Sequence, residues 1–149
     1  MPRYYDSGVL VKLYVHEPFS AAAVEAVSEA GLAISVNPLQ ELEVTNAVRL
    51  KVFRGDISDA EREAALRALR SDVECGRLRR SSVDWTSAFL KALELSADAT
   101  SAIGCRSLDI LHVGVAIVEG CGEFVSMDRR QTGAARRAGL NVIDIRETE

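Results

Sequence analysis

Four acidic residues stand where a small α/β protein would bring carboxylates together: Asp6, Glu43, Asp109 and Asp128. Asp6 and Asp128 each follow a short strand-like run and precede helix-compatible sequence. In an open parallel sheet, ligands bind outside the carboxyl ends of the strands. A cluster of carboxylates at that edge requires a divalent cation to neutralise its charge, and such hard oxygen ligands suit Mg²⁺ or Mn²⁺. The pattern therefore predicts a metal-dependent phosphodiesterase.

Length and composition narrow the class of protein. The chain has 149 residues, 48% of them hydrophobic, which predicts one domain over residues 1–149 with its own core. No apolar run reaches the roughly 18–20 residues of a membrane span, and the N-terminal residues lack the apolar segment of a signal peptide. Cys75, Cys105 and Cys121 show neither CxxC nor zinc-finger spacing, so we expect reduced thiols in a cytoplasmic protein. With a net charge of −4, an RNA substrate would have to meet local arginines and a bound cation.

Strand-like and helical segments alternate along the chain. We expect strands at 3–5, 32–36, 78–83, 124–127 and 141–145, and helices at 7–15, 21–30, 38–53, 59–74, 86–95, 108–120 and 129–138. Strands separated by helices imply an α/β fold with a parallel sheet and helices on both of its faces.

Helix starts are the most clearly marked local features. Asn37, Pro38 and Gln40 match an N-cap, a first helical residue and the third position of a capping box. We also expect Ser58 and Ser107 to cap the helices that follow them.

Within the expected helix at 38–53, Glu43 falls in the middle of a stripe that we expect to face the core. At about 100° per residue, the stripe comprises Leu39, Leu42, Asn46, Leu50 and Phe53. Glu41 lies roughly 160° away from Glu43. An unpaired carboxylate on a core-facing stripe is costly, so we expect Glu43 to project into a polar pocket that holds metal. The alternative is that Glu43 caps the edge of the core or pairs with a buried arginine, in which case Glu41 is the fallback.

The other three acids have ordinary structural explanations. An acid in the first turn of a helix is favoured by the helix dipole, and Ser107 as N-cap would place Asp109 at the second helical position. Asp6 and Asp128 could be plain N-caps. We favour a functional role because the apolar helix after Asp109 must be central to the core, so that its start lies deep against the sheet. Four such coincidences in one chain are also harder to accept than one.

Four segments resemble the motifs of PIN-domain ribonucleases, in particular the VapC toxins of type II toxin–antitoxin systems. They are DSGVLVKLY at 6–14 with Glu17-Pro18, EVTNAV at 43–48, RSLDILHV at 106–113, and FVSMDRRQ at 124–131 with the residues to Val142. The resemblance covers nearly the whole chain. It implies a PIN-like three-layer fold with a roughly five-stranded parallel sheet flanked by helices, and cleavage of RNA with Mg²⁺ or Mn²⁺.

The resemblance also assigns roles to residues. The family's metal-binding acids correspond to Asp6, Glu43, Asp109 and Asp128, and the hydroxyl of its fourth motif to Ser126. Gly8 departs from the family, which often carries a second hydroxyl there, but Ser7 remains. We expect Asp6 and Asp109 to be the direct ligands of the principal ion. Glu43 and Asp128 would act through water or hold a second ion roughly 4 Å away. In-line attack by a metal-activated water would leave a 5′-phosphate and a 3′-hydroxyl.

Other polar residues have weaker claims on the site. His112 lies one turn from Asp109 but is expected to be a hydrogen-bonded core residue, and His16 a surface residue. Arg129 and Arg130 follow Asp128 and could hold RNA phosphates.

The resemblance implies partners as well. These are a homodimer and a cognate antitoxin, whose amphipathic segment would fill an apolar groove and place an arginine or lysine among the carboxylates. No membrane partner is expected.

Three other classes of protein are alternatives to a ribonuclease. A haloacid dehalogenase-type phosphatase requires a second Asp where Gly8 stands. A response-regulator receiver requires an acid pair at the first strand and a lysine after a late strand, and neither is present. The remaining alternative is a catalytically inactive PIN-like scaffold that binds RNA or protein.

Overall fold

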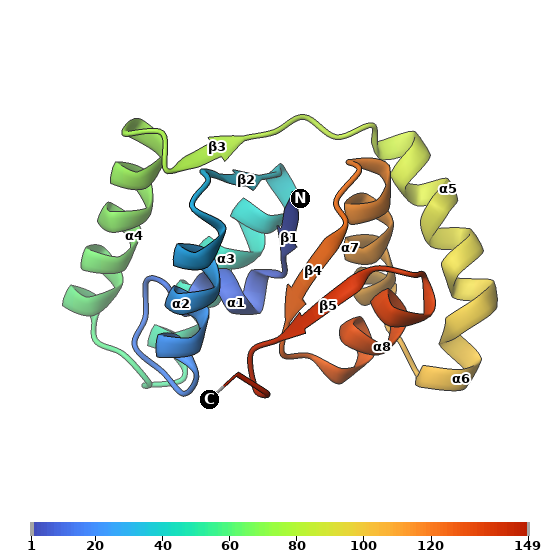
Figure 1. The fold of residues 1–149 in the computed structure, drawn as a ribbon. Coiled ribbons are helices and arrows are strands. Elements are labelled where there is room, and N and C mark those ends of the chain that lie inside the picture. Colours follow the sequence, from blue (N-terminus) through green and yellow to red (C-terminus); the bar gives the residue numbers. More distant parts are fainter. Residues whose placement is uncertain (1, 149) are drawn as a thin grey trace. The chain divides into compact units, whose positions relative to one another are not determined.

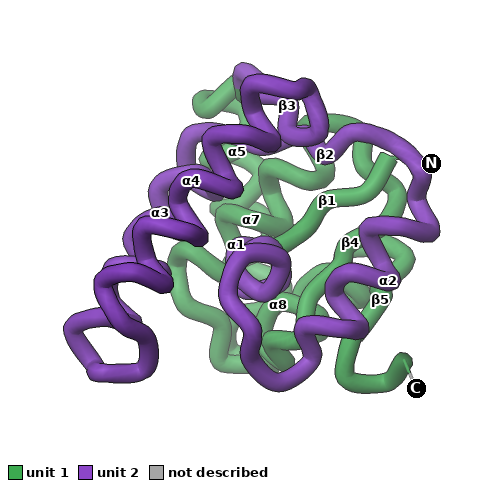
Figure 2. The backbone as a smooth tube through the Cα atoms, turned by 90° about the vertical axis from the view of Figure 1, so that its left-hand side faces the viewer, with its two compact units in different colours: residues 1–6, 83–149 green, residues 7–82 purple. Residues whose placement is uncertain are grey.

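The computed structural model describes residues 2–148, and the chain divides into two compact units. Unit 1 comprises residues 1–6 and 83–149, and unit 2 comprises residues 7–82 (Figure 2). Each unit has its own set of parallel strands and helices, and each is described by itself below. The single domain over 1–149 that the sequence suggests stays a prediction.

The sheet of unit 1 contains three parallel strands, with β4 (Glu123–Ser126) between β1 (Arg3–Tyr5) and β5 (Asn141–Asp144) (Figure 1). Its register pairs Tyr5 with Val125 and Ser126 with Asp144. Because β1 and β4 are parallel and in this register, Asp6, which follows β1, and the residues that follow Ser126 leave the sheet at the same edge. This is the edge at which the sequence predicts a site.

Four helical segments complete unit 1 (Figure 1). They are α5 (Trp85–Leu95), α6 (Ser101–Ile103), α7 (Ser107–Val118) and α8 (Arg129–Arg137). A π-helical turn (Ser96–Thr100) joins α5 to α6 without a break. The continuation of α5 was not predicted. All residues of α7 from Asp109 to Ala116 are buried, as expected for a central helix.

The start of α7 differs from the prediction in one respect. Arg106, not Ser107, is the N-cap, because its backbone is extended and Ser107 already has helical geometry. Asp109 is therefore the third helical residue, and its carboxylate accepts a hydrogen bond from the backbone N–H of Arg106 (2.9 Å). This contact closes half of a capping box around the helix start.

Unit 2 is built from four helices and two short parallel strands (Figure 1). Its elements are α1 (Ser7–Val11), α2 (Ser20–Ala30), β2 (Ile34–Val36), α3 (Pro38–Phe53), α4 (Asp59–Glu74) and β3 (Leu78–Arg80), with β2 paired to β3. Capping boxes begin α3 at Asn37 and α4 at Ser58, which confirms both predicted helix starts.

The predicted fold class is confirmed: parallel strands alternate with helices throughout. Within residues 2–148 the structure has five strands, all parallel, but they form a sheet of three and a separate sheet of two. No helix in this range is both long enough and apolar enough to cross a bilayer.

The predicted core-facing stripe of α3 is wrong. Leu42 and Phe53 are exposed, the latter by 87%, whereas the buried side chains of α3 are Gln40, Val44 and Val48. These three are spaced by four residues and form one row along the helix, and α3 packs against α1 and α4 within unit 2. Apolar residues occur on two faces of α3, and the sequence pattern favoured the face that the packing leaves open.

Close packing of α5 on α7 depends on Gly114. A Cβ atom at this position would lie 2.9 Å from the backbone oxygen of Ala88 and 3.2 Å from the backbone nitrogen of Ala92. Gly114→Ala should therefore lower the free energy of unfolding by about 1–3 kcal/mol through overpacking, despite the better helix propensity of alanine. Gly133→Ala in α8 is the control, since its Cβ would meet only the movable side chain of Ile103 at 3.2 Å. Urea unfolding should place the Gly114→Ala midpoint below that of Gly133→Ala; equal midpoints would contradict the packing argument.

Candidate active site

Three of the four predicted acids belong to unit 1. Asp6 follows β1 directly, Asp128 comes two residues after β4, and Asp109 lies in the first turn of α7. Asp6 and Asp109 are almost fully buried, with 3% and 4% of their surface exposed, and Asp128 is partly exposed. Buried carboxylates must be compensated by hydrogen bonds or by cations. Their immediate contacts therefore decide what the site can do.

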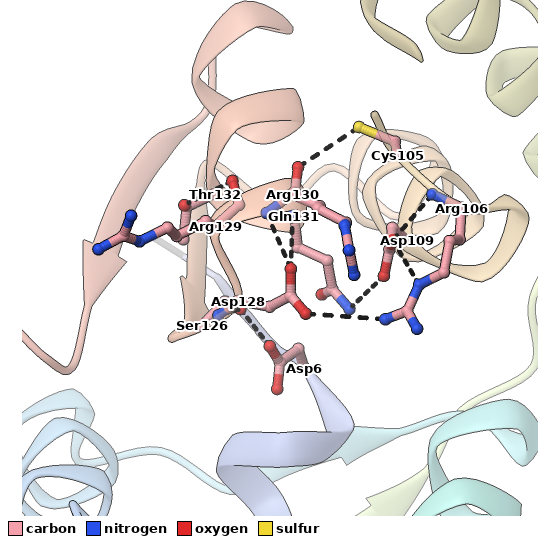
Figure 3. Close-up of polar contacts among 10 residues, drawn as sticks. All are labelled: Asp6, Cys105, Arg106, Asp109, Ser126, Asp128, Arg129, Arg130, Gln131 and Thr132. Atoms are coloured by element: carbon pink, nitrogen blue, oxygen red, sulfur yellow. Dashed lines mark hydrogen bonds and ion pairs between the residues drawn. The ribbon is translucent and has the colours of Figure 1, made fainter. Parts of the chain in front are cut away.

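Ser126 links Asp6 to Asp128 (Figure 3). Its hydroxyl donates to Oδ2 of Asp6 and accepts the backbone N–H of Asp128 at 3.0 Å. The side chain of Ser126 is wholly buried at the last position of β4. Pairing of β1 with β4 brings the hydroxyl to Asp6, so the strand register itself orients this carboxylate.

Asp128 is the N-cap of α8, as the ordinary structural explanation predicts. Its Oδ1 accepts the backbone N–H groups of Arg130 (2.8 Å) and Gln131 (3.3 Å). Its Oδ2 takes no part in capping and lies 4.0 Å from Nη2 of Arg106. The cap therefore holds the carboxyl group in place while one oxygen remains available to a cation.

Asp109 is held from both sides. Its Oδ2 accepts from the backbone N–H of Arg106 and, at 3.4 Å, from Nε of the same residue. Its Oδ1 accepts from the side-chain amide of Gln131 (3.4 Å), which comes from α8 (Figure 3). Contacts thus run without a break from Asp6 through Ser126, Asp128 and Arg106 to Asp109.

Arg106 is the cation of this network, although no role was predicted for it from the sequence. Its guanidinium contacts Asp109 and Asp128 at long distances, and its side chain is 68% exposed. Exposed ion pairs of this length are weak and screened by salt. The signals were present in the sequence, since Arg106 stands three residues before Asp109 and Gln131 three residues after Asp128, the spacing of capping partners.

Glu43 belongs to unit 2, where it is partly buried and accepts a hydrogen bond from the hydroxyl of Ser7 (3.1 Å). Glu41, the fallback, forms two hydrogen bonds with Arg80 (2.8 and 3.0 Å), and these lower the pKa of its carboxyl group. Because a guanidinium already occupies Glu41, Glu43 is the better candidate on α3. Its convergence with the acids of unit 1 stays a prediction.

The remaining predicted residues fall as expected. Nδ1 of His112 lies 2.7 Å from the hydroxyl of Tyr4, and the histidine is 1% exposed, so it is a hydrogen-bonded core residue. His16 is exposed, and so are Arg129 and Arg130 at the start of α8.

The thiol of Cys105 responds to the charge of the site. Burial raises its pKa, and the carboxylates of Asp109 and Asp128 raise it further. Its Sγ donates to the backbone oxygen of Arg130 at 3.5 Å. At neutral pH this cysteine is a protonated neighbour of the carboxylates.

The donors of the site suit a hard divalent cation. Carboxylates dominate, and Oε1 of Gln131, beside Asp109, is buried with no hydrogen-bond partner among the described residues, so it can accept from a metal-bound water. Within residues 2–148 no group of three or more His, Cys, Asp or Glu side chains is arranged so that it could hold a metal ion. Mg²⁺ usually keeps several waters and needs only one or two carboxylates from the protein. An open set formed around Asp6 and Asp109 therefore fits this ion.

The sequence matches no family model and no curated protein. Among solved structures, it is similar to the crystal structure of FitAcB from Neisseria gonorrhoeae, with a TM-score of 0.61 over 99% of both chains. The two sequences are 12% identical. The likeness therefore shows a shared fold, and it is consistent with the PIN-like architecture that the motifs imply.

Ser126 gives a test of the network. Ser126→Ala should lower the free energy of unfolding by about 1–3 kcal/mol, because it removes a hydrogen bond to a buried carboxylate. The same change in an Asp6→Asn background should cost clearly less, since its charged partner is gone. Chemical denaturation of the four proteins of this cycle measures the difference. Equal costs in both backgrounds would mean that Ser126 does not stabilise Asp6.

Proposed function

We propose that this protein is a metal-dependent endoribonuclease that hydrolyses RNA phosphodiester bonds and acts as the toxin of a toxin–antitoxin pair. The observation that carries the proposal is a set of three carboxylates joined by polar contacts: Asp6 and Asp128, which follow β1 and β4, and Asp109 at the start of α7. Two of them, Asp6 and Asp109, are buried; the Ser126 hydroxyl orients the first, and the Gln131 amide and Arg106 contact the second. A divalent cation would stabilise buried carboxylates of this kind more than any other ligand, because it compensates their charge directly.

In this mechanism Asp6 and Asp109 would hold Mg²⁺ or Mn²⁺, and Asp128 and Glu43 would act through water or at a second ion. The bound ion would supply a water of lowered pKa and would neutralise charge on the displaced oxygen. Ser126 keeps the Asp6 carboxylate turned toward the site. Asp128 keeps one oxygen free because capping uses only the other. Arg129 and Arg130, exposed at the start of α8, neutralise phosphates of the RNA.

The proposed antitoxin contact is supported by an apolar groove between α5 and α7. The groove measures about 350 Å³ and its lining includes Phe89, Leu93, Leu108 and Ile110. Three of these side chains are unusually exposed for their type, at 49–67%. The lining also includes Arg106, so an amphipathic segment in the groove could place a cationic side chain beside Asp109. A homodimer, implied by the family resemblance, is part of the same proposal.

An inactive scaffold is the second candidate, and Arg106 is the observation that favours it. A guanidinium beside Asp109 and Asp128 offsets part of their negative charge without any metal. In that case the acidic pocket would be a docking site for RNA or a basic protein partner.

The first experiment separates the two functions by measuring cleavage of a fluorescent single-stranded RNA with Mg²⁺ or Mn²⁺. Asp6→Asn and Asp109→Asn should each lower the rate on the order of 100-fold or more, because they remove a charged metal ligand. Glu43→Gln should also lower it, whereas Glu41→Gln on the same helix should leave it unchanged. Excess EDTA should stop the wild type. If the wild type cuts no RNA with either metal, the scaffold is the correct function.

A second experiment measures metal binding without any substrate. By calorimetry, Arg106→Gln should bind Mn²⁺ about fivefold more tightly than the wild type, because the metal no longer has to displace a guanidinium from the carboxylates. Arg137→Gln is the control: it removes the same charge from unit 1, but from a guanidinium that pairs with Asp98 at 2.8 Å. An Arg106→Gln affinity equal to that of the control would show that Arg106 does not compete with the metal.

A further inference from the structure

A second polar depression lies in unit 1. It measures about 430 Å³ and is lined by Arg129, Thr132, Arg136, Arg146 and Glu147. We call it the arginine pocket. Three of its residues lie on α8, and the other two follow β5. None of them was part of the predicted set of acids.

The spacing of arginines along α8 forms this pocket. Arg129 and Arg136 are seven residues apart, which is close to two helical turns, so they share one face of the helix. Arg130 and Arg137 repeat the spacing about 100° further round. Arg137 is engaged by Asp98 and does not line the pocket. The pair Arg129 and Arg136 therefore lines the pocket, whereas Arg137, on the other face, is held by an ion pair.

Arg146 is fixed in place before any ligand arrives. Its guanidinium forms a two-pronged contact with the carboxylate of Asp144, and its backbone N–H donates to the same group at 3.0 Å. The side chain of Asp144 is completely buried, and these hydrogen bonds hold its pKa below the ordinary value. A buried anchor on one side leaves the partly exposed guanidinium little freedom to move away.

The pocket is locally positive in a chain whose net charge is −4. Three guanidinium groups line it, although that of Arg146 is already paired with Asp144, and among residues 2–148 one carboxylate lines it as well. That carboxylate, Glu147, lies 3.9 Å from Arg136, and both side chains are at least half exposed, so the pair is weak. In the described part of the chain, Arg129 has no ion pair. A concave surface with this charge is suited to an anion with several oxygens.

We propose that the arginine pocket binds a phosphate of the RNA backbone next to the one that is cleaved. The inference rests on the proposed function, because it takes RNA as the substrate. RNA fits better than an acidic peptide because the pocket begins at Arg129, the residue that follows Asp128. Arg136 lies about 10 Å further along the axis of α8 at 1.5 Å per residue. A single strand leaving the candidate active site along this helix would carry its next phosphates over the pocket.

The test measures binding alone, in EDTA so that no RNA is cut, by fluorescence anisotropy of a short labelled single-stranded RNA. Arg136→Gln should weaken binding about three- to tenfold and reduce the slope of log K against log salt by about 0.7, the value for one phosphate contact on a single strand. Arg137→Gln, the neighbouring arginine outside the pocket, should change neither quantity. Glu147→Gln should strengthen binding, because it removes the one carboxylate that lines the pocket in the described part of the chain. Arg146 is unsuitable for substitution because its loss would leave Asp144 buried without its cation.

Three results would overturn the proposal. The first is an equal loss of affinity in Arg136→Gln and Arg137→Gln, which would reflect general charge. The second is a wild type that binds no RNA in EDTA at low salt. The third is a polyglutamate peptide that displaces RNA from the wild type at lower concentration than unlabelled RNA does. Failure of the proposed function is distinguishable: RNA that is bound through Arg136 but never cut with metal rejects the nuclease and retains the pocket.

Discussion

The structure of unit 1 depends on how it compensates two buried carboxylates. Asp6 and Asp109 each lose most of their hydration on folding, and an uncompensated charge there would cost several kcal/mol. The protein meets this cost with neutral donors from the neighbouring strand and helix, the Ser126 hydroxyl and the Gln131 amide. Neutral donors orient a carboxylate but leave its negative charge in place. A site compensated in this way still attracts a cation, and the exposed guanidinium of Arg106 interacts with it only weakly.

The fold around the carboxylates follows from the same requirement. Asp109 is buried because α7 is buried along almost its whole length, and α7 can lie that deep because Gly114 lets α5 approach its backbone. Asp6 is in position because β1 pairs in parallel with β4, which aligns the ends of both strands. The polar site is thus positioned by apolar packing and strand register. Substitutions far from any carboxylate can therefore displace it.

Local features of this structure could be predicted from the sequence, and features that depend on packing could not. The capping boxes at Asn37 and Ser58 involve residues three apart, and both predictions are confirmed. The prediction of the buried face of α3 was wrong, because Leu42 and Val44 lie on different faces of the helix and only tertiary contacts decide which face is buried. For the same reason the contact of Gln131 with Asp109, 22 positions away, could not be derived from spacing. The division of the parallel strands between two sheets could not be predicted either, because strands and helices alternate along the chain in the same way whether the strands form one sheet or two.

Helix α8 shows how ordinary helix energetics can distribute charge for a function. A carboxylate at the N-terminus and cations in the last turn both stabilise a helix through its dipole, and α8 has Asp128 at one end and Arg136 and Arg137 at the other. The residues that stabilise the helix therefore also place a carboxylate before its first residue, Arg129, and two guanidinium groups in its last turn. Under the proposed function, the Asp128 carboxylate contributes to metal binding and the guanidinium groups of Arg129 and Arg136 to RNA affinity, so the two properties should respond to different side chains of one helix.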